Sequence, residues 1–465
     1  MEAANAFAEM LSNVIWAFLL WFLVGCGIFF TLRLRLIQFV RFGHMFTVLK
    51  GGGKSDDSGI SPVQALCTTL AARVGTGNVA GVAIAVTLGG PGAVFWMWVI
   101  ALVGMSTGFV EATLAQLFKT RDGEGQYRGG PAYYMERGLG QRWMGVLFSF
   151  LLILAFGFVF NAVQANTISG AMEGAFGAPG WVTGLIMVGL TSLIIFGGLR
   201  SIARFSQLAV PIMAAAYLLL AVVLIIINID QMPGILAMIV KSAFGFEEAA
   251  AGGIGAAIMN GFKRGLFSNE AGMGSSPNVA ASAVPYPNHP ASQGFVQMAG
   301  VFFDTLLICT ASAAIVLLAG PQEGEGIMLV QNALNAQVGN WGQYFLAIIV
   351  LFFAFTSIVA NYSYAENCMV FLRPAGSSRL IVFRLAVLAT VMFGALASLP
   401  FVWTLADISM GLMAITNLTA LVLLSKLAVK LARDYGDQRR AGKVPNFDAN
   451  AYPEIQKKLE PGIWD

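Results

Sequence analysis

Charged residues are scarce in this chain. Only 11% of its 465 residues carry a charge and 57% are hydrophobic, whereas a soluble domain has roughly 25% charged residues. This composition excludes a cytosolic enzyme, which needs a charged, water-facing surface, and it equally excludes a disordered chain. A net charge of +3 is too small to indicate a nucleic-acid partner, because the basic residues are spread over short loops.

Cysteine and histidine are also rare. The two histidines, His44 and His289, fall in predicted polar loops, so haem or histidine–metal chemistry is poorly supplied. The sequence contains no P-loop, no HExxH motif and no Ser-His-Asp set or paired carboxylates, which disfavours an ATP-driven pump and a membrane-embedded enzyme. The four cysteines lie in apolar stretches without a CxxC pair, which argues against a disulfide framework or a zinc site: Cys26, Cys67, Cys309 and Cys368.

Long apolar runs, in contrast, are abundant. A helix needs ~20 mostly apolar residues to cross a bilayer, and helices satisfy their own backbone groups there. We therefore predict an all-α polytopic membrane protein with eleven transmembrane helices. The predicted spans are 12–32, 61–88, 92–118, 143–171, 181–198, 204–229, 251–284, 293–319, 341–371, 378–398 and 401–427.

The distribution of positive charge predicts an orientation. With eleven spans and the N-terminus outside, 23 of the 27 Lys and Arg residues fall in inside loops or in the tail, and one, Lys241, falls in an outside loop. The C-terminus is therefore expected in the cytoplasm. Two shorter apolar stretches, 232–246 and 326–340, fall on the outer side; they are expected either to lie on the bundle as external lids or to be ordinary surface helices.

Two of the spans are unusually rich in glycine and polar residues. Span 61–88 contains RVGTGNVAG (73–81) and span 251–284 contains GLFSNEAGMGSSP (265–277). Each is followed by four further spans, so the two five-span units run in opposite orientation, as in an inverted repeat. An internal pseudo-twofold of this kind disfavours a channel. The predicted organisation is an extra helix with its cytoplasmic linker (1–60), a first repeat (61–229), an external connector (230–250), a second repeat (251–427) and a cytoplasmic tail (428–465).

The glycine clusters are interpreted as breaks within two helices. Glycine lets the backbone leave a helix at little steric cost, and a break frees carbonyl groups on one side and N–H groups on the other. Carbonyl oxygens suit Na⁺, and N–H groups at a helix N-terminus suit a carboxylate. Close helix packing is the alternative role for such glycines, but two matched breaks favour the first interpretation.

Several motifs resemble the sodium:alanine/glycine symporter family, within the amino acid–polyamine–organocation superfamily. The resemblance covers about residues 30–427 and implies a leucine-transporter-type fold with one extra helix before a five-plus-five inverted repeat. It also implies sodium-coupled uptake of a small neutral amino acid, alanine or glycine, across a bacterial inner membrane, with Na⁺ as coupling ion and no cofactor. A nutrient receptor of the same fold that binds without transporting remains the alternative. The motifs are GTGNVAGVA (75–83), GGPGAVFWMW (89–98), GGPAYYM (129–135), NAVQAN (161–166), GLFSNEAGMGSSP (265–277) and FAFTS (353–357).

The resemblance also implies functional residues. The substrate positions are Thr76, Gly77, Asn78, Gln164, Phe267, Ser268 and Asn269, and the sodium positions are Thr356 and Ser357. Backbone oxygens near Ala71 and Val74, beside the first break, are expected to complete the sodium site. Two positions depart from the family pattern: Arg73 replaces a small residue beside the first break, and Asn361 stands where some members have a tryptophan that caps the substrate. The size of the substrate pocket is therefore left open.

Charged residues within spans are expensive and usually functional. Glu270, in the second break, is expected to pair with Arg73 or Lys263, with a role in gating or proton coupling as the alternative. Glu111 and Asp304 are expected to have partners inside the bundle, and the span-end residues Glu366 and Asp407 are expected to be solvated. The full set is Arg73, Glu111, Lys263, Arg264, Glu270, Asp304, Glu366 and Asp407.

Overall fold

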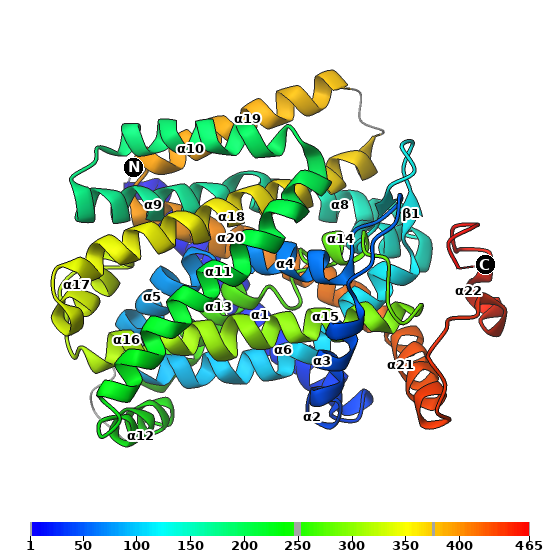
Figure 1. Cartoon of the computed structure of the whole chain (residues 1–465), viewed down its shortest axis with the longest axis horizontal. Coiled ribbons are helices and arrows are strands. Elements are labelled where there is room, and N and C mark those ends of the chain that lie inside the picture. Colours follow the sequence, from blue (N-terminus) through cyan, green and yellow to red (C-terminus); the bar gives the residue numbers. More distant parts are fainter. Residues whose placement is uncertain (1, 246–252, 374–376, 465) are drawn as a thin grey trace.

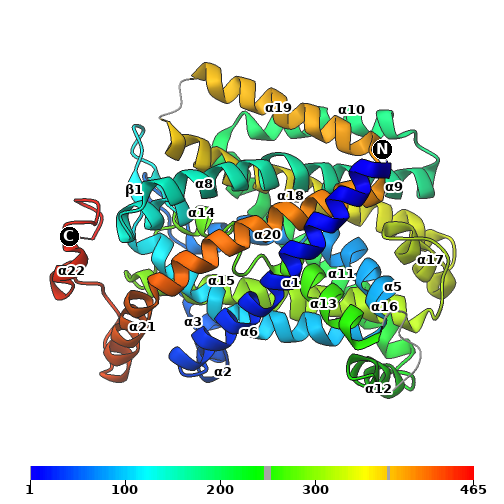
Figure 2. The same ribbon diagram turned by 180° about the vertical axis from the view of Figure 1, so that it is seen from behind.

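The chain folds into a bundle of helices. The computed structural model describes residues 2–245, 253–373 and 377–464. Most of the long helices run along one common direction, and the two chain ends lie at opposite ends of the bundle in that direction (Figures 1 and 2). The only sheet in the described part is a hairpin of β1 (Thr120–Arg121) and β2 (Tyr127–Arg128), paired antiparallel. The prediction of an all-α membrane protein is confirmed at this level.

The elements of the first half precede Asn228. They are α1 (Glu2–Arg33), α2 (Ile37–Val40), α3 (Phe42–Gly51), α4 (Pro62–Arg73), η1 (Gly77–Gly81), α5 (Val82–Gly89), α6 (Gly92–Leu117), α7 (Pro131–Tyr133), η2 (Tyr134–Gly138), α8 (Arg142–Leu152), η3 (Ile153–Val159), α9 (Phe160–Phe176), α10 (Gly180–Ile195) and α11 (Gly198–Ile227).

The second half has a similar succession, followed by a tail. Its elements are α12 (Met232–Ala243), α13 (Gly253–Asn269), α14 (Pro277–Ala280), α15 (Pro290–Val301), η4 (Phe302–Cys309), α16 (Thr310–Leu318), α17 (Ile327–Val338), α18 (Trp341–Leu372), α19 (Ser377–Leu396), α20 (Leu399–Leu423), α21 (Ser425–Arg440), η5 (Ala449–Ala451) and α22 (Pro453–Gln456). The segments η1 to η4 are π-helical turns inside or beside α-helices.

Within the described residues, eight helices are long and apolar enough to cross a membrane, or nine when the bent pair formed by 62–73 and 77–89 is counted as one span. Two of the eleven predicted spans fall short. Span 181–198 is the 16-residue helix α10, and span 251–284 is the 17-residue α13 followed by an irregular segment and the short α14. Residues 251 and 252 of that span lie outside the described residues. Eleven crossings therefore stay a prediction.

Helices from the two halves pack in corresponding pairs. In the predicted repeats, α6 and α15 each follow the broken helix, and these two pack against each other. The next helices, α9 and α18, also pack together, as do α10 and α19 after them. Figure 2 shows α1, the extra helix, crossing the bundle beside α20. This pairing is the arrangement that an internal repeat would produce, although the repeat itself stays a prediction.

Side-chain periodicity explains which face of each helix is buried. On α11 the residues Leu208, Ile212, Leu219 and Ile226 recur on one helical face and are all well exposed, as expected for a surface that meets lipid. On the opposite face Tyr217 is fully buried.

The two predicted external segments form the short helices α12 and α17. Both lie at the end of the bundle that carries the N-terminus (Figure 1), and residue 246 of the predicted segment is outside the described residues. The opposite end carries α2, α3, the β-hairpin, α21 and α22. The expectation that both histidines lie in polar loops is wrong for His44, which lies within α3. His289 does lie in the connection before α15, but it is fully buried and caps that helix.

Candidate functional site

The first break interrupts the predicted span 61–88 directly after Arg73. Ser61 starts α4 with a capping box, in which its hydroxyl accepts from the Gln64 amide and the Gln64 side chain accepts from the Ser61 amide. The helix ends at Arg73, and the two halves of the pair meet at 54°. The Gly75 amide donates to Asn78 Oδ1 at 3.0 Å. The Asn78 side chain therefore satisfies a donor that the break exposes.

Glycine is also required here by close approach of other helices. A Cβ at Gly75 would collide with Ser357 Oγ and lie 2.9 Å from Gln164 Oε1. A Cβ at Gly77 would lie 2.6 Å from the ring of Phe267. Both roles that the sequence allows for these glycines, a chain break and close packing, are thus present at the same point.

The second break is longer than the first and differs in form. After α13 ends at Asn269, residues 270–276 have no helical structure, and α14 that follows has only four residues. Glu270, Gly272 and Gly274 have positive φ angles of 57°, 98° and 79°. Gly272 and Gly274 adopt these angles at little steric cost, because glycine has no Cβ. Glu270 adopts a conformation that residues with a side chain rarely take.

The unwound segment is held by two neighbouring helices. Glu111 of α6 accepts from the Gly274 amide at 3.1 Å, and Asn417 of α20 donates to the Gly272 carbonyl at 3.0 Å and to Glu111 at 2.5 Å. The expectation that Glu111 has a partner inside the bundle is therefore confirmed. Asn417 was not predicted, and its only signal in the sequence is an asparagine within the apolar run 401–427.

The two broken helices meet at a buried carboxylate. Asn78 Nδ2 donates to Asp304 Oδ1 at 2.6 Å and to Ser268 Oγ at 3.0 Å. The Ser268 hydroxyl in turn donates to Asp304 Oδ2 at 2.5 Å, and the Thr305 hydroxyl donates to the same oxygen at 2.8 Å. Asp304 is fully buried, and none of the ion pairs of the described residues includes it. Its expected partners inside the bundle are thus neutral donors from both broken helices.

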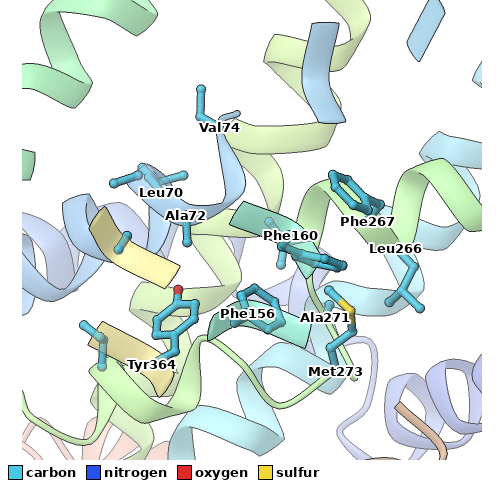
Figure 3. Close-up of a cluster of buried hydrophobic side chains, with 14 of the residues drawn as sticks. Leu70, Ala72, Val74, Phe156, Phe160, Leu266, Phe267, Ala271, Met273 and Tyr364 are labelled. Atoms are coloured by element: carbon cyan, nitrogen blue, oxygen red, sulfur yellow. The ribbon is translucent and has the colours of Figure 1, made fainter. Parts of the chain in front are cut away.

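Aromatic rings pack beside this junction. The Phe267 ring lies between Phe160 of α9, with centroids 4.6 Å apart, and Trp403 of α20, at 4.8 Å. Figure 3 shows Phe160 and Phe156 from α9 and η3 beneath Phe267, with Val74 of the first break above them. The guanidinium carbon of Arg264 lies over the ring of Trp403, 4.8 Å from its centroid. Trp403 was not predicted, and aromatic content in an apolar span gives no signal of such a role.

Of the remaining predicted substrate residues, Gln164 and Thr76 lie together at the first break, whereas Asn269 contacts its own segment. Gln164 of α9 accepts from the Thr76 amide at 3.1 Å, so it contacts the first break as expected. The Thr76 hydroxyl is buried without a partner among the described residues. Asn269, in contrast, turns back on its own segment, because its Oδ1 accepts from the Ala271 amide at 3.0 Å.

Among the predicted sodium positions, the structure brings Ser357 and Ala71 together. The Ser357 hydroxyl donates to the Ala71 carbonyl at 2.7 Å and to the Phe353 carbonyl of its own helix at 2.9 Å. Thr356 points elsewhere, with its hydroxyl donating to Phe353 and lying 3.8 Å from Met213 Sδ of α11. Val74 is buried at the break itself (Figure 3).

Arg73 and Glu270 are connected through a serine. Arg73 Nη2 donates to Ser276 Oγ at 2.7 Å, and the Ser276 hydroxyl donates to Glu270 Oε2 at 3.1 Å. Ser275 donates to the same carboxylate oxygen at 2.6 Å. Lys263, the other expected partner of Glu270, lies instead 3.6 Å from Asp407.

The expectation that Asp407 and Glu366 are solvated is wrong. Asp407 is 7% exposed and accepts from Arg264 through both carboxylate oxygens. Glu366 is 6% exposed and accepts from the Tyr362 hydroxyl at 2.5 Å. Both residues lie within helices, Asp407 in α20 and Glu366 in α18, and long basic side chains from other elements reach them.

The partners of Glu366 come from three elements. Arg128 of the β-hairpin and Arg384 of α19 each place a guanidinium nitrogen 3.7 Å from it. These three residues line a cavity of about 990 Å³ at the end of the bundle that carries the C-terminus. An ion-pair cluster therefore joins α18, α19 and the hairpin beside this cavity.

Together, the apolar helices, the glycine-rich break in one span and the polar junction buried between two interrupted helices define a membrane transporter. Irregular backbone at membrane depth is tolerated where it is enclosed by protein or lines a cavity, and binding sites are built at such points. The model of the sodium:alanine symporter family matches residues 1–449. The chain belongs to this family of sodium-coupled amino-acid symporters, as its motifs indicated.

Named relatives match nearly the whole chain. It is 49% identical to the amino-acid carrier protein AlsT of Bacillus subtilis, over 97% of this chain and 96% of the relative. It is 49% identical to the probable sodium/glutamine symporter GlnT of the same organism, over 94% and 91%. It is 38% identical to the sodium/alanine symporter AgcS of Methanococcus maripaludis, over 92% and 96%.

Proposed function

We propose that this protein carries a small neutral amino acid, alanine or glycine, into the cell together with Na⁺ by alternating access. The observation that carries the proposal is the meeting of two interrupted helices at Asn78, Ser268 and Asp304, deep inside a bundle of apolar helices. Family membership and the names of AlsT and AgcS support an amino acid as the cargo.

The amino acid is proposed to bind at the first break. The backbone amides of Gly77 and Asn78 lie at the start of the resumed helix, where an N-terminus favours a carboxylate. Thr76 offers a buried hydroxyl without a partner in the described part of the chain. Carbonyl groups near Phe267 would accept from the ammonium group. Because Phe267 packs closely over Gly77, the space for a substrate side chain is small, which supports alanine or glycine over glutamine.

The Na⁺ ion is proposed to bind between α4 and α18. The Ala71 carbonyl and the Ser357 hydroxyl already face each other at 2.7 Å, and neutral oxygen ligands suit a weakly held monovalent cation. An ion held by both groups would link the first broken helix to α18. Coupling follows if this link favours the conformation of the break that binds the amino acid.

The proposed topology has eleven crossings, built as one extra helix and an inverted five-plus-five repeat. The packing of α6 on α15, α9 on α18 and α10 on α19 supports the repeat. The position of the two termini at opposite ends of the bundle supports an odd number of crossings. With the arginine-rich end in the cytoplasm, the N-terminus is outside, the C-terminus is inside, and the membrane is the bacterial inner membrane.

Uptake into proteoliposomes tests the proposal. Purified protein is reconstituted, and labelled L-alanine uptake is compared under an inward Na⁺ gradient and an equal inward K⁺ gradient. We expect accumulation above equilibrium with Na⁺ alone, and competition by unlabelled glycine but weaker competition by glutamine. Binding of alanine without Na⁺-dependent accumulation would contradict transport and identify a nutrient receptor.

A further inference from the structure

A basic pocket lies at the end of the bundle that carries the C-terminus, between the last turn of α1, the short helix α2 and the tail helix α21. Its volume is about 470 Å³. Both views of the ribbon show α2 and α21 near each other at this end (Figures 1 and 2). Six arginines and one carboxylate line it: Arg33, Arg35, Arg41, Arg433, Arg439, Arg440 and Asp437. We call this cavity the arginine pocket.

The positive charge of the arginine pocket is not neutralised by the protein. Asp437 forms an ion pair with Arg440, its neighbour on α21. None of the ion pairs within residues 2–245, 253–373 and 377–464 reaches the other five arginines. Like charges gathered in one cavity repel each other, so the pocket is arranged for an anion from outside the chain.

Two of the arginines approach each other across the pocket. Arg41 extends from the end of α2 over α21, where its Nη2 lies 3.8 Å from the position that a Cβ on Gly436 would take. Burial and the charge of Arg41 lower the pKa of Arg439. Burial, followed by the charges of Arg439 and Arg41, also lowers the pKa of the neighbouring His44 to about 4. The field in the pocket is therefore strongly positive.

Exposed apolar side chains adjoin the lining residues in the chain, and one of them, Val40, itself lines the pocket; we call them the apolar rim. Leu36, Phe39 and Val40 of the α2 region are 45%, 56% and 68% exposed, and Leu32 of α1 is 66% exposed. The turn between α1 and α2 places Arg35 in the pocket and leaves Leu36 exposed. Both residues have left-handed backbone angles, with φ of 55° and 56°, which cost energy for residues with a side chain. Leu32 belongs to a row of exposed apolar side chains on one face of α1 that also includes Trp21 and Ile28.

We propose that the arginine pocket binds the headgroup phosphate of an anionic phospholipid, whose acyl chains lie against Leu36, Phe39 and Val40. Guanidinium groups bind phosphate oxygens in a bidentate manner, and basic pockets at the cytoplasmic ends of membrane helices recognise anionic headgroups. The apolar rim favours a lipid over a free anion, because a small ion would leave these side chains in water. A bound lipid relieves the repulsion between Arg41 and Arg439 and thereby holds α21 against α1.

The experiment compares lipids on the full-length protein in detergent. Phosphatidylglycerol, phosphatidylcholine with the same acyl chains, and glycerol 3-phosphate without acyl chains are added in separate titrations. Bound lipid is counted by native mass spectrometry, and the melting temperature is followed by tryptophan fluorescence. We expect phosphatidylglycerol to bind at least about tenfold more tightly than phosphatidylcholine and to raise the melting temperature, with each arginine near a phosphate contributing to the difference.

Variants identify the pocket as the site. The Arg41→Gln/Arg439→Gln double variant is expected to bind phosphatidylglycerol about tenfold more weakly and to lose its thermal stabilisation. The Arg373→Gln/Arg379→Gln double variant removes the same charge from exposed positions elsewhere and is expected to behave as wild type. If the first variant does not fold, the unmodified protein still provides a test, because added salt should weaken binding of phosphatidylglycerol and leave phosphatidylcholine unaffected.

Three outcomes would overturn the proposal. Equal binding of both lipids would exclude headgroup recognition. Stabilisation by glycerol 3-phosphate at the same concentration as phosphatidylglycerol would indicate a small-anion site in place of a lipid site. Wild-type affinity for phosphatidylglycerol in the Arg41→Gln/Arg439→Gln variant would place the lipid elsewhere.

Discussion

Asn78 of the first broken helix donates to Asp304 of η4 at 2.6 Å, although the two residues are 226 positions apart in the chain. The same amide nitrogen lies 3.0 Å from Ser268 of the second broken helix. Because Oδ1 of the same side chain accepts from the Gly75 amide, the Asn78 side chain connects the break itself to the buried carboxylate. The carboxylate of Asp304 therefore accepts hydrogen bonds from both broken helices.

Removing the charge of Asp304 tests this connection. Asp304→Asn keeps the size of the side chain but replaces one acceptor oxygen with a donor, so either Asn78 or Ser268 loses its partner. An unsatisfied buried group costs roughly 1–3 kcal/mol, which corresponds to about a tenfold loss of transport or more. We expect Na⁺-driven alanine uptake to fall by about that factor in proteoliposomes, with a higher Na⁺ concentration needed for half-maximal rate.

The matched control is Asp230→Asn, which removes a carboxylate from an exposed position in the connection between α11 and α12. It should leave alanine uptake unchanged. Wild-type rate and Na⁺ dependence in a folded Asp304→Asn protein would show that the carboxylate is only structural.

The second prediction concerns the size of the substrate. Phe267 closes over Gly77 and is packed between Phe160 and Trp403. Phe267→Leu shortens this side chain without removing it, which creates space beside the first break. A hydrophobic pocket discriminates by ~1–3 kcal/mol per methylene group. We expect glutamine to compete with labelled alanine roughly tenfold better in this variant than in wild type.

Phe18→Leu serves as the control, because Phe18 lies on α1 and packs against Phe22 of the same helix. An unchanged ratio of glutamine to alanine inhibition in Phe267→Leu would mean that another residue limits the pocket.

The positions of the breaks can be predicted from the sequence, because glycine, asparagine and glutamate are uncommon in apolar spans and stand out by type. The length and backbone path of the second break cannot be predicted in this way. Its seven residues outside α13 and α14 are held open by Glu111 and Asn417, which belong to helices far away in the chain. Local residue type gives no measure of how far such distant partners extend an unwound segment.

The environment of the charged residues was predicted only in part. Asp407 looked solvated from its place near a span end, yet Arg264, 143 positions earlier, reaches it. Long side chains carry charge several ångströms from their backbone position. The pairing therefore depends on tertiary packing, which hydropathy along a single chain does not contain.

A third prediction separates the two hydroxyl residues of the FAFTS motif. Adjacent residues on an α-helix point about 100° apart, so only one of Thr356 and Ser357 faces Ala71. The structure assigns this contact to Ser357. We expect Ser357→Ala to raise the Na⁺ concentration for half-maximal alanine uptake by about tenfold, as loss of an ion ligand would, and Thr356→Ala to raise it less.

The two variants control for each other, since each removes one hydroxyl from neighbouring buried positions. The measurement is the rate of uptake against external Na⁺ at fixed alanine. A larger effect of Thr356→Ala would contradict the proposed ion site and place the ion nearer to α11.

A fourth prediction concerns the close approach of the breaks. Gly77→Ala places a Cβ 2.6 Å from the Phe267 ring, and the Ser268 backbone lies 3.6 Å away. Overpacking of this kind costs typically ~1–3 kcal/mol. We expect a lower melting temperature and loss of most alanine uptake. Gly255→Ala in α13 is the control, because no atom lies within 4 Å of its new Cβ; it should keep the wild-type melting temperature and alanine uptake. Full uptake by Gly77→Ala would show that the breaks separate during transport.

The last prediction is a pH dependence of the tail. His289 Nε2 lies 3.2 Å from Asp434 Oδ2 of α21, while its Nδ1 accepts from the Ala291 amide at 3.1 Å. The ring is therefore neutral, with its proton on Nε2. Burial lowers the pKa of His289 below its ordinary value of 6.5. Burial tends to raise the pKa of Asp434, but its hydrogen bonds, that from His289 first, lower it overall.

Both shifts act in the same direction. A histidine with a lowered pKa stabilises the fold fully above 6.5, and this contribution is lost as the pH falls below that value. An aspartate with a lowered pKa also loses its contribution on acidification, but only below its ordinary 3.8. We expect the melting temperature in detergent to fall by roughly 2 °C or more between pH 7.5 and pH 5, as protonated His289 releases the Ala291 amide.

His289→Gln supplies the control, because glutamine can accept from Ala291 and donate to Asp434 without titrating. Its melting temperature should depend less on pH than that of the wild type over the same interval. Equal pH dependence of the two proteins would assign the acid sensitivity to other groups. A steeper dependence in His289→Gln would reverse the sign derived from the buried neutral ring, since it would mean that the charged histidine stabilises the docked tail.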